Sequence, residues 1–210
     1  ISSKGAVTLN DVLAHHNGET GALVKNDYLG SIGAVTLTGS AIFTENAIDG
    51  LQILTNGLIK INNMTASSNG QIGANLDNRG SSTAQPVTLT GTNRFEDNGS
   101  DGLYIQSDGL ITVNNINANI NGARGISLNN TSGITTGVTL TGVNIFNENN
   151  GDGLYIRSNG LLTLANLTAN DSVTGYGANL ENSSAPAAGP ANVTLIGTNV
   201  FNNNAQDGIF

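Results

Sequence analysis

Short runs of alternating hydrophobic and polar residues fill the chain, and Asn or Gly ends each run. The segment Val-Thr-Leu-Thr-Gly begins at Val35, Val87 and Val138, and a close variant begins at Val193. In an extended chain the Val and Leu side chains of this segment point to one side and the Thr side chains to the other. The alternation predicts short β-strands with one buried face, and therefore an all-β fold.

The strands recur at a long, regular interval. Each of the segments above is followed by Phe, and these Phe residues lie 52, 51 and 55 residues apart. Asn follows each Phe after three residues, and Asp-Gly follows after six. The residues at these positions are Phe43, Phe95, Phe146 and Phe201; Asn46, Asn98, Asn149 and Asn204; and Asp49, Asp101, Asp152 and Asp207. We call this part of the repeat the Phe half.

A second set of similar segments, the Ala half, lies between the first. These segments begin near residues 7, 59, 111 and 162, and they carry Ala where the Phe half carries Phe. At the position where the Phe half has its repeated Asn, the Ala half has Asn17, Asn69, Asn121 and, as an exception, Ser172. The repeat of about 52 residues thus consists of two related halves, a pattern typical of stacked repeat architectures.

Each half reads as three short strands joined by turns, which is one coil of a solenoid rather than a set of hairpins. Equivalent strands of successive coils would pair in parallel about 4.8 Å apart. The Val-Thr-Leu-Thr-Gly and Asp-Gly-Leu-Tyr-Ile segments and the repeated Asn resemble the right-handed parallel β-helix of the pectate-lyase-like superfamily. They also resemble repeat regions of large bacterial surface adhesins and fibres. We predict one segment, residues 1–210, with about eight coils in four tandem double-coil repeats and no caps. A β-sandwich is the alternative.

The repeated positions have structural interpretations. We expect Phe43, Phe95, Phe146 and Phe201 to share one interior column with the Ala residues, because alternating large and small side chains fill a core evenly. Stacked amides would bond coil to coil as an asparagine ladder. Its members would be Asn17, Asn46, Asn69, Asn98, Asn121, Asn149 and Asn204.

Acidic, basic and imidazole groups offer little active-site chemistry. Asp49, Asp101, Asp152 and Asp207 are weak calcium candidates, but Asp-Gly is also a common turn pair, and alternate coils would separate these residues by about 9.6 Å. The Arg residues fall at different coil positions. Neighbouring strand residues face opposite sides, so His15 and His16 are expected in an exposed turn without a joint site. We expect no catalytic residue, cofactor or dedicated metal site.

Composition narrows the classes of partner. The net charge is −8, with only 7 Lys and Arg residues and no basic cluster, so nucleic acid is not an expected partner. Cys is absent, which excludes disulfides and thiolate metal sites. No apolar run approaches the length of a membrane span. Outward Thr columns leave ice binding open, and sequon-bearing loops after the Ala halves leave glycans open as partners.

The two ends of the chain read as parts of one strand. The residues at the end resemble the start of the strand at Asp101, and those at the beginning resemble its continuation. Across such a junction Phe201 and Phe43 would be 52 residues apart, as within the chain. The seam residues are Asp207, Gly208, Ile209, Phe210, Ile1, Ser2 and Ser3. We therefore expect either a longer tandem array or copies that stack head to tail.

These expectations favour a structural role. The hypothesis is a segment or subunit of an extracellular bacterial filament, sheath or giant adhesin at the cell surface, with itself as the main partner. The alternative is a carbohydrate-binding or carbohydrate-active β-helix. An ice-binding surface protein is the third possibility.

Overall fold

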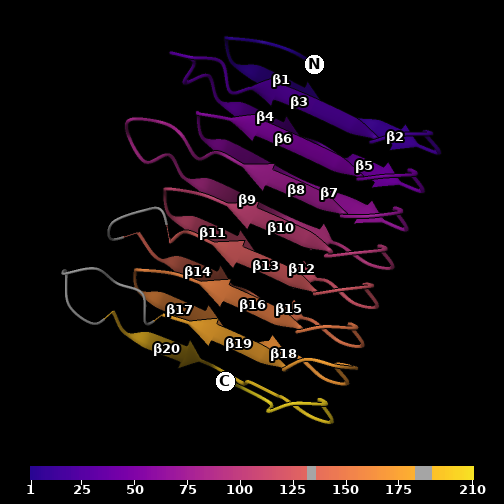
Figure 1. Ribbon diagram of the computed structural model, residues 1–210, viewed down its shortest axis with the longest axis vertical. Coiled ribbons are helices and arrows are strands. Elements are labelled where there is room, and N and C mark those ends of the chain that lie inside the picture. The colour runs from indigo at the N-terminus through magenta and orange to yellow at the C-terminus, as the bar shows by residue number, and fades with distance from the viewer. Residues whose placement is uncertain (132–135, 183–190) are drawn as a thin grey trace.

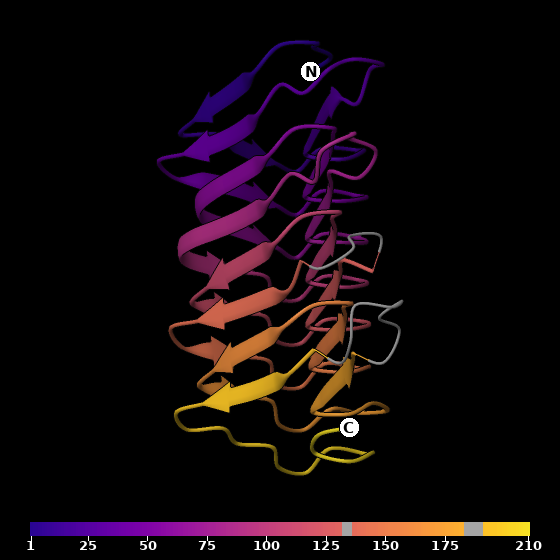
Figure 2. The same cartoon turned by 90° about the vertical axis from the view of Figure 1, so that its left-hand side faces the viewer.

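The computed structural model describes residues 1–131, 136–182 and 191–210 as a stack of short parallel strands (Figure 1). Within these ranges there is no helix, and the strands form one 13-stranded sheet and one 7-stranded sheet. The chain winds through about seven turns, from the indigo N-terminus to the yellow C-terminus (Figure 2). The predicted all-β parallel solenoid is confirmed.

Each coil runs along three faces. The first face holds β1 (Val7–Asn10), β4 (Val35–Thr38), β7 (Ile59–Ser67), β9 (Val87–Arg94), β11 (Ile111–Asn114), β14 (Val138–Thr141), β17 (Leu162–Ala165) and β20 (Val193–Ile196). The second face holds β2 (Leu13–His15), β5 (Ala41–Thr44), the ends of β7 and β9, β12 (Ile116–Asn117), β15 (Asn144–Ile145) and β18 (Leu167–Thr168). The third face holds β3 (Ala22–Asn26), β6 (Leu51–Thr55), β8 (Ala74–Asp77), β10 (Leu103–Gln106), β13 (Ile126–Asn129), β16 (Leu154–Arg157) and β19 (Ala178–Glu181).

The core lies inside the coils and follows the sequence alternation. Strand β4 has the burial pattern buried, intermediate, buried, intermediate, with Val35 and Leu37 fully enclosed. Phe43 pairs with Ala14 on one side and Ala66 on the other, so large and small side chains alternate along the axis as expected. Phe43, Phe95 and Phe146 are fully buried, whereas Phe201 in the last coil is partly exposed. Tight packing of this column makes each Phe costly to remove.

A left-handed residue stands at the corner between the first and second faces of every coil. Ala halves use Asn or Asp there and Phe halves use Gly, as in Asn63 with φ 57° and Gly91 with φ 75°. Asn63 Oδ1 accepts a hydrogen bond from the Thr92 amide of the next coil, at 3.0 Å. A Cβ on Gly91 would lie 2.1 Å from that same oxygen, so no larger side chain fits there. The two halves of the repeat are therefore sterically complementary.

Candidate functional site

The asparagine ladder is formed at the corner between the second and third faces, which we call the ladder corner. Asn69 Nδ2 donates to Asn98 Oδ1 at 3.0 Å, and Asn98 Nδ2 donates to Asn121 Oδ1 at 3.0 Å. Each amide also bonds backbone, as Asn98 Nδ2 does with Ala66 O at 3.0 Å. The continuous series runs through Asn17, Asn46, Asn69, Asn98, Asn121 and Asn149.

Ser172 interrupts the ladder. Its turn is one residue longer, since Gly177 follows Ser172 after five residues, whereas Gly125 follows Asn121 after four. Ser172 Oγ donates to Tyr176 O at 3.0 Å, within its own turn. The Ser172 amide still donates to Asn204 Oδ1 at 3.0 Å, so the backbone link to the next coil is kept.

The residue just before each ladder position is left-handed in all eight coils, whatever its type. The series is His16, Glu45, Ser68, Asp97, Ile120, Glu148, Asp171 and Asn203. Such a conformation costs energy for most side chains, and here the ladder bonds on either side hold it in place. It redirects the chain, so the side chains before and after it do not follow simple strand alternation.

The repeated aspartates bond to the next coil. Asp49 Oδ1 accepts from the Ile72 amide at 3.0 Å, Asp101 Oδ1 from the Arg124 amide at 2.9 Å and Asp152 Oδ1 from the Tyr176 amide at 2.9 Å. These carboxyls are buried, whereas Asp207 in the last coil is exposed. One oxygen of each buried carboxyl is thus already occupied by backbone, which favours a bracing role over calcium binding.

Burial sets the titration of two of these carboxyls. Desolvation raises the pKa of Asp49, and hydrogen bonds from the Ile72 amide and the Asn75 side chain oppose the rise. Desolvation likewise raises the pKa of Asp101 against the Arg124 amide and the Arg124 charge, while the nearby Asp152 adds to the rise. The cause in both cases is loss of water around the charged form.

A second column of buried amides, not anticipated from the sequence, lies where the third face leads into the long loops. We call it the loop corner and define it by Asn26, Asn78, Asn130 and Asn182. Asn78 Nδ2 donates to Gln85 O at 2.8 Å, across its own loop. In the Phe halves Thr55, Ser107 and Ser158 take the equivalent place with shorter turns. An Asn nine residues after Asn17, Asn69 and Asn121 was the available sequence signal.

The outward Thr columns have the expected register. The first runs through Thr8, Thr36, Lys60, Thr88, Thr112, Thr139, Thr163 and Thr194. In the second column hydroxyls pair with amides: Thr38 Oγ1 donates to Asn10 Oδ1 at 2.9 Å, and Thr90 Oγ1 donates to Asn62 Oδ1 at 3.1 Å. The hydroxyls Thr38 Oγ1 and Thr90 Oγ1 of the second column are thus already engaged with Asn side chains. An ice-binding surface would therefore have to use the hydroxyls of the first column.

Charged and aromatic side chains gather on the outer side of the third face. The Arg124 guanidinium lies 4.3 Å from the centre of the Tyr155 ring, and the Tyr155 hydroxyl donates to Glu181 Oε1 at 2.8 Å. Arg157 Nε lies 2.9 Å from Glu181 Oε2. Arg124 and Arg157 occupy different coil positions, as expected, since Arg157 pairs with Asn129. Both nevertheless lie on the surface around Tyr155 and Glu181. Burial, followed by the bond to Glu181, raises the pKa of Tyr155.

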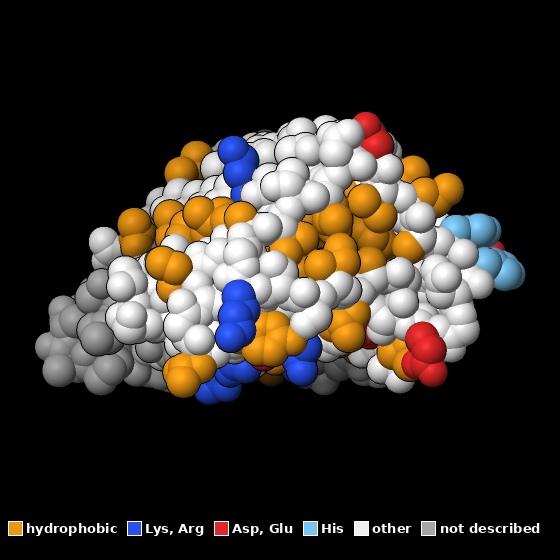
Figure 3. Space-filling view, turned by 90° about the horizontal axis from the view of Figure 1, so that it is seen from above, with side chains coloured by type: hydrophobic (Ala, Val, Ile, Leu, Met, Phe, Trp, Pro, Cys, Tyr) orange, Lys and Arg blue, Asp and Glu red, His pale blue; other side chains and the backbone are white. Residues whose placement is uncertain are grey.

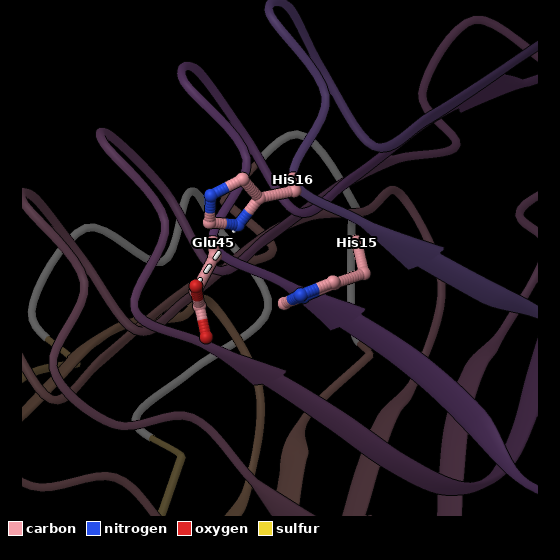
Figure 4. A group of neighbouring side chains, drawn as sticks. All are labelled: His15, His16 and Glu45. Atoms are coloured by element: carbon pink, nitrogen blue, oxygen red, sulfur yellow. Dashed lines mark ion pairs between the residues drawn. The ribbon is translucent and has the colours of Figure 1, made fainter.

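The two histidines also come together, contrary to expectation. His16 has φ 60°, so the chain turns at this residue instead of alternating. The two rings lie 4.9 Å apart between centres, and His16 Nδ1 lies 2.9 Å from Glu45 Oε2 in the next coil. Figure 4 shows the three side chains around one exposed region of the surface.

The seam residues at the two ends of the chain lie at opposite ends of the solenoid. They correspond to the first and second parts of the same third-face strand. Ser2 bridges to Lys25 in β3, and Ile209 bridges to Ala178 in β19. Through the registers of the third face, Ile209 falls on the position of Leu103, and Ser2 falls on the position of Gln106. The two segments thus match the beginning and the continuation of the same strand.

Parts of two long loops, 132–135 and 183–190, lie outside the described residues, and with them parts of the sequons. A hollow between two other loops is lined by Leu29, Gly30, Ser31, Ile32, Asn56, Gly80, Ser81 and Ser82, which offer no ionisable side chain. In the described part of the chain no helix has the length and hydrophobicity to cross a membrane.

No family model, curated protein or solved structure matches the chain.

Proposed function

We propose that the chain is a structural segment or subunit of an extracellular bacterial filament, sheath or large adhesin, with copies that stack head to tail. One observation carries the proposal: the two terminal segments occupy complementary halves of one third-face strand. A second copy stacked on either end would continue the same hydrogen-bonded ladders. Such a head-to-tail contact repeats without closing, which produces a fibre.

Exposure of core positions at both ends supports this role. Val193 is 44% exposed, although its partner Leu162 in the preceding coil is fully buried. At the other end Leu9 is partly exposed, and its partner Leu37 is fully buried. Hydrophobic side chains spread over the N-terminal end face (Figure 3). Apolar surface of this kind gains free energy when another coil covers it.

The test is cross-linking in register. If one copy stacks on another, Phe210 of the first would pair with Leu23 of the second, because both fall on the Tyr104 position. The chain has no Cys, so Phe210→Cys with Leu23→Cys introduces the only thiols. A minimal bifunctional thiol cross-linker should give multimers, and electron microscopy should show an axial repeat of about 38 Å, eight coils at the usual strand spacing.

The matched control moves one thiol two residues along the same strand. Phe210→Cys with Lys25→Cys should cross-link less, because the pair is out of register. A chain that stays monomeric up to about 1 mM and yields no multimers with the in-register pair would refute stacking. Equal cross-linking of both pairs would mean that the ends associate without the proposed register.

Arg124, Tyr155, Arg157 and Glu181 form a surface group that we call the Tyr155 cluster. This cluster favours a second candidate function, the binding of carbohydrate along the third face. Two guanidinium groups, a carboxylate and a tyrosine on neighbouring coils match the groups that recognise sugar hydroxyls and acids. Arg124 covers one side of the Tyr155 ring, so a glycan would be held more by charge than by stacking. Glycan-array binding that is lost in Arg124→Ala would support it; no binding by the unmodified chain would refute it.

A further inference from the structure

The first two coils bring a group of metal-ligating side chains together at the ladder corner. His15 ends β2, His16 follows it, and Glu45 follows β5 of the next coil. Ligand atoms of all three side chains lie within 4.8 Å of one another. We propose that His15, His16 and Glu45 form a binding site for a transition-metal ion, with Zn²⁺ the ion that suits it best.

The donor atoms select the class of metal. Two imidazoles and one carboxylate are a known ligand set for Zn²⁺, which then keeps a fourth position for water. Imidazole also suits Cu²⁺ and Ni²⁺, whereas Ca²⁺ and Mg²⁺ prefer sites built from oxygen. The site therefore discriminates against the two hard cations that are otherwise abundant outside cells.

The geometry needs only small side-chain movements. Tetrahedral ligands on zinc stand about 3.4 Å apart, given bond lengths near 2.1 Å. His16 Nδ1 and Glu45 Oε2 are already 2.9 Å apart, and their side chains are 72% and 50% exposed, so their rotamers can adjust without repacking. The ion would enter between groups that now contact each other directly.

Neighbouring groups preorganise the site. Thr44 Oγ1 lies 3.1 Å from His15 Nδ1, which orients that ring and leaves Nε2 as its ligating nitrogen. The left-handed conformation at His16 and at Glu45, with φ 60° and 54°, is fixed by the ladder on either side. The backbone thus holds both residues in place before any metal binds.

Binding would join the first coil to the second. The histidines belong to one coil and the carboxylate to the next, so the ion bridges them outside the backbone ladder. The core of this coil is partly exposed, because Leu9 and Ala14 are only partly buried. An ion that binds only the folded state stabilises it by mass action. Zn²⁺ should therefore stabilise the first coil, whose core is partly exposed to solvent.

The experiment is calorimetric titration of the whole chain with Zn²⁺ alone. We expect one ion per chain, and Ca²⁺ should not compete. His15→Gln, His16→Gln and Glu45→Gln should each weaken binding by at least about tenfold, since even indirect partners of a metal cost that much when removed. Zn²⁺ should also slow hydrogen exchange of β2 in the unmodified chain and not in these variants.

The repeat provides matched controls. Glu148 takes the place of Glu45 two repeats later, after Asn119 and Ile120 where the first coil has the histidines. Glu148→Gln should leave zinc binding unchanged. Asn119→His combined with Ile120→His should create a second site, and the stoichiometry should rise to two. Unchanged zinc affinity in His15→Gln and His16→Gln would overturn the proposal, as would the absence of binding by the unmodified chain.

Discussion

The ladder corner and the loop corner both bury a column of Asn side chains, but the amides face different partners. At the ladder corner Asn98 accepts from Asn69 and donates to Asn121, so its two ends reach two other coils. At the loop corner Asn78 donates chiefly to Gln85 O in its own loop, and Asn78 Oδ1 has no partner among the described residues. The first amide bonds other ladder amides along the axis, whereas the second bonds only backbone carbonyls: those of its own loop and, at 3.3 Å, Gly57 O of the preceding coil.

This difference explains where the chain varies in length. A ladder that bonds to itself requires the same turn geometry in every coil, and the longer turn at Ser172 is where the series of amides breaks. An amide that closes its own loop tolerates changes in that loop. Asn78 reaches a carbonyl seven residues away, and Asn182 reaches Ala191 O nine residues away. Variable loops therefore occur at the corner where the Asn side chains bond backbone carbonyls, mainly those of their own loop, and do not bond one another.

The largest expected effect comes from the core beneath the ladder corner. Phe95→Ala removes a fully buried ring. The backbone carbonyl of Phe95 accepts a hydrogen bond from the ladder residue Asn121, with Nδ2 at 3.0 Å. We expect a loss of about 3–5 kcal/mol in the free energy of unfolding, measured with urea. A loss below about 1.5 kcal/mol would mean that the column collapses around the cavity and that the ladder does not rest on it.

Asn98→Ala tests the ladder directly. The change removes an acceptor for Asn69 and a donor to Asn121 and Ala66, all in a site that is 2% exposed. Several buried polar groups lose partners, so we expect a loss of about 2–4 kcal/mol. Hydrogen exchange should quicken in both neighbouring coils. Faster exchange in the mutated coil alone would contradict coupling along the axis.

Asn78→Ala is the matched change at the loop corner, with the same residue type and full burial. It removes the donor to Gln85 O and Pro86 O of its own loop and to Gly57 O of the preceding coil, but it breaks no bond to another buried amide, so we expect a smaller loss of about 1–2 kcal/mol. Faster exchange should be confined to residues 79–86. If Asn78→Ala destabilised the protein as much as Asn98→Ala, the distinction between the two corners would fail.

The smallest effect concerns the carboxyl that follows the ladder. Burial raises the folded-state pKa of Asp101 above its ordinary 3.8, so the folded protein binds a proton more tightly than the unfolded chain. The unmodified protein therefore loses stability as pH rises from 3.8 through the raised pKa. Asp101→Asn keeps the acceptor for the Arg124 amide without the charge. Its stability relative to the unmodified protein should increase as pH rises from 3.8 through the raised pKa of Asp101, since the variant carries no buried charge. If the difference in unfolding free energy between Asp101→Asn and the unmodified protein did not change with pH, burial of the Asp101 charge would carry no cost.

Much of the fold was predictable because stacked coils repeat their register. The Phe and Ala column, the Thr columns and six ladder amides follow from counting equivalent positions. The loop-corner amides were missed because Asn alternates there with Ser or Thr, which hides the column. The histidines are exposed as expected, but their rings come together because strand alternation fails at a left-handed residue. The sequence does not mark that residue, since His, Glu, Ser, Asp and Ile all adopt the same conformation in this column.

The corner formed by Asn63 and Gly91 has a consequence for how such a chain can lengthen. Asn115 Nδ2 donates back to Gly91 O at 3.2 Å, while a side chain on Gly91 would collide with Asn63 Oδ1. Each amide thus needs a glycine in the coil above it, and it donates to a backbone carbonyl in the coil below it. A duplication that copied a single coil would set amide against amide or glycine against glycine. Only copies of whole pairs of coils preserve the fit, so recombination within the gene should add or remove material in steps of about 52 residues, the spacing of its Phe codons.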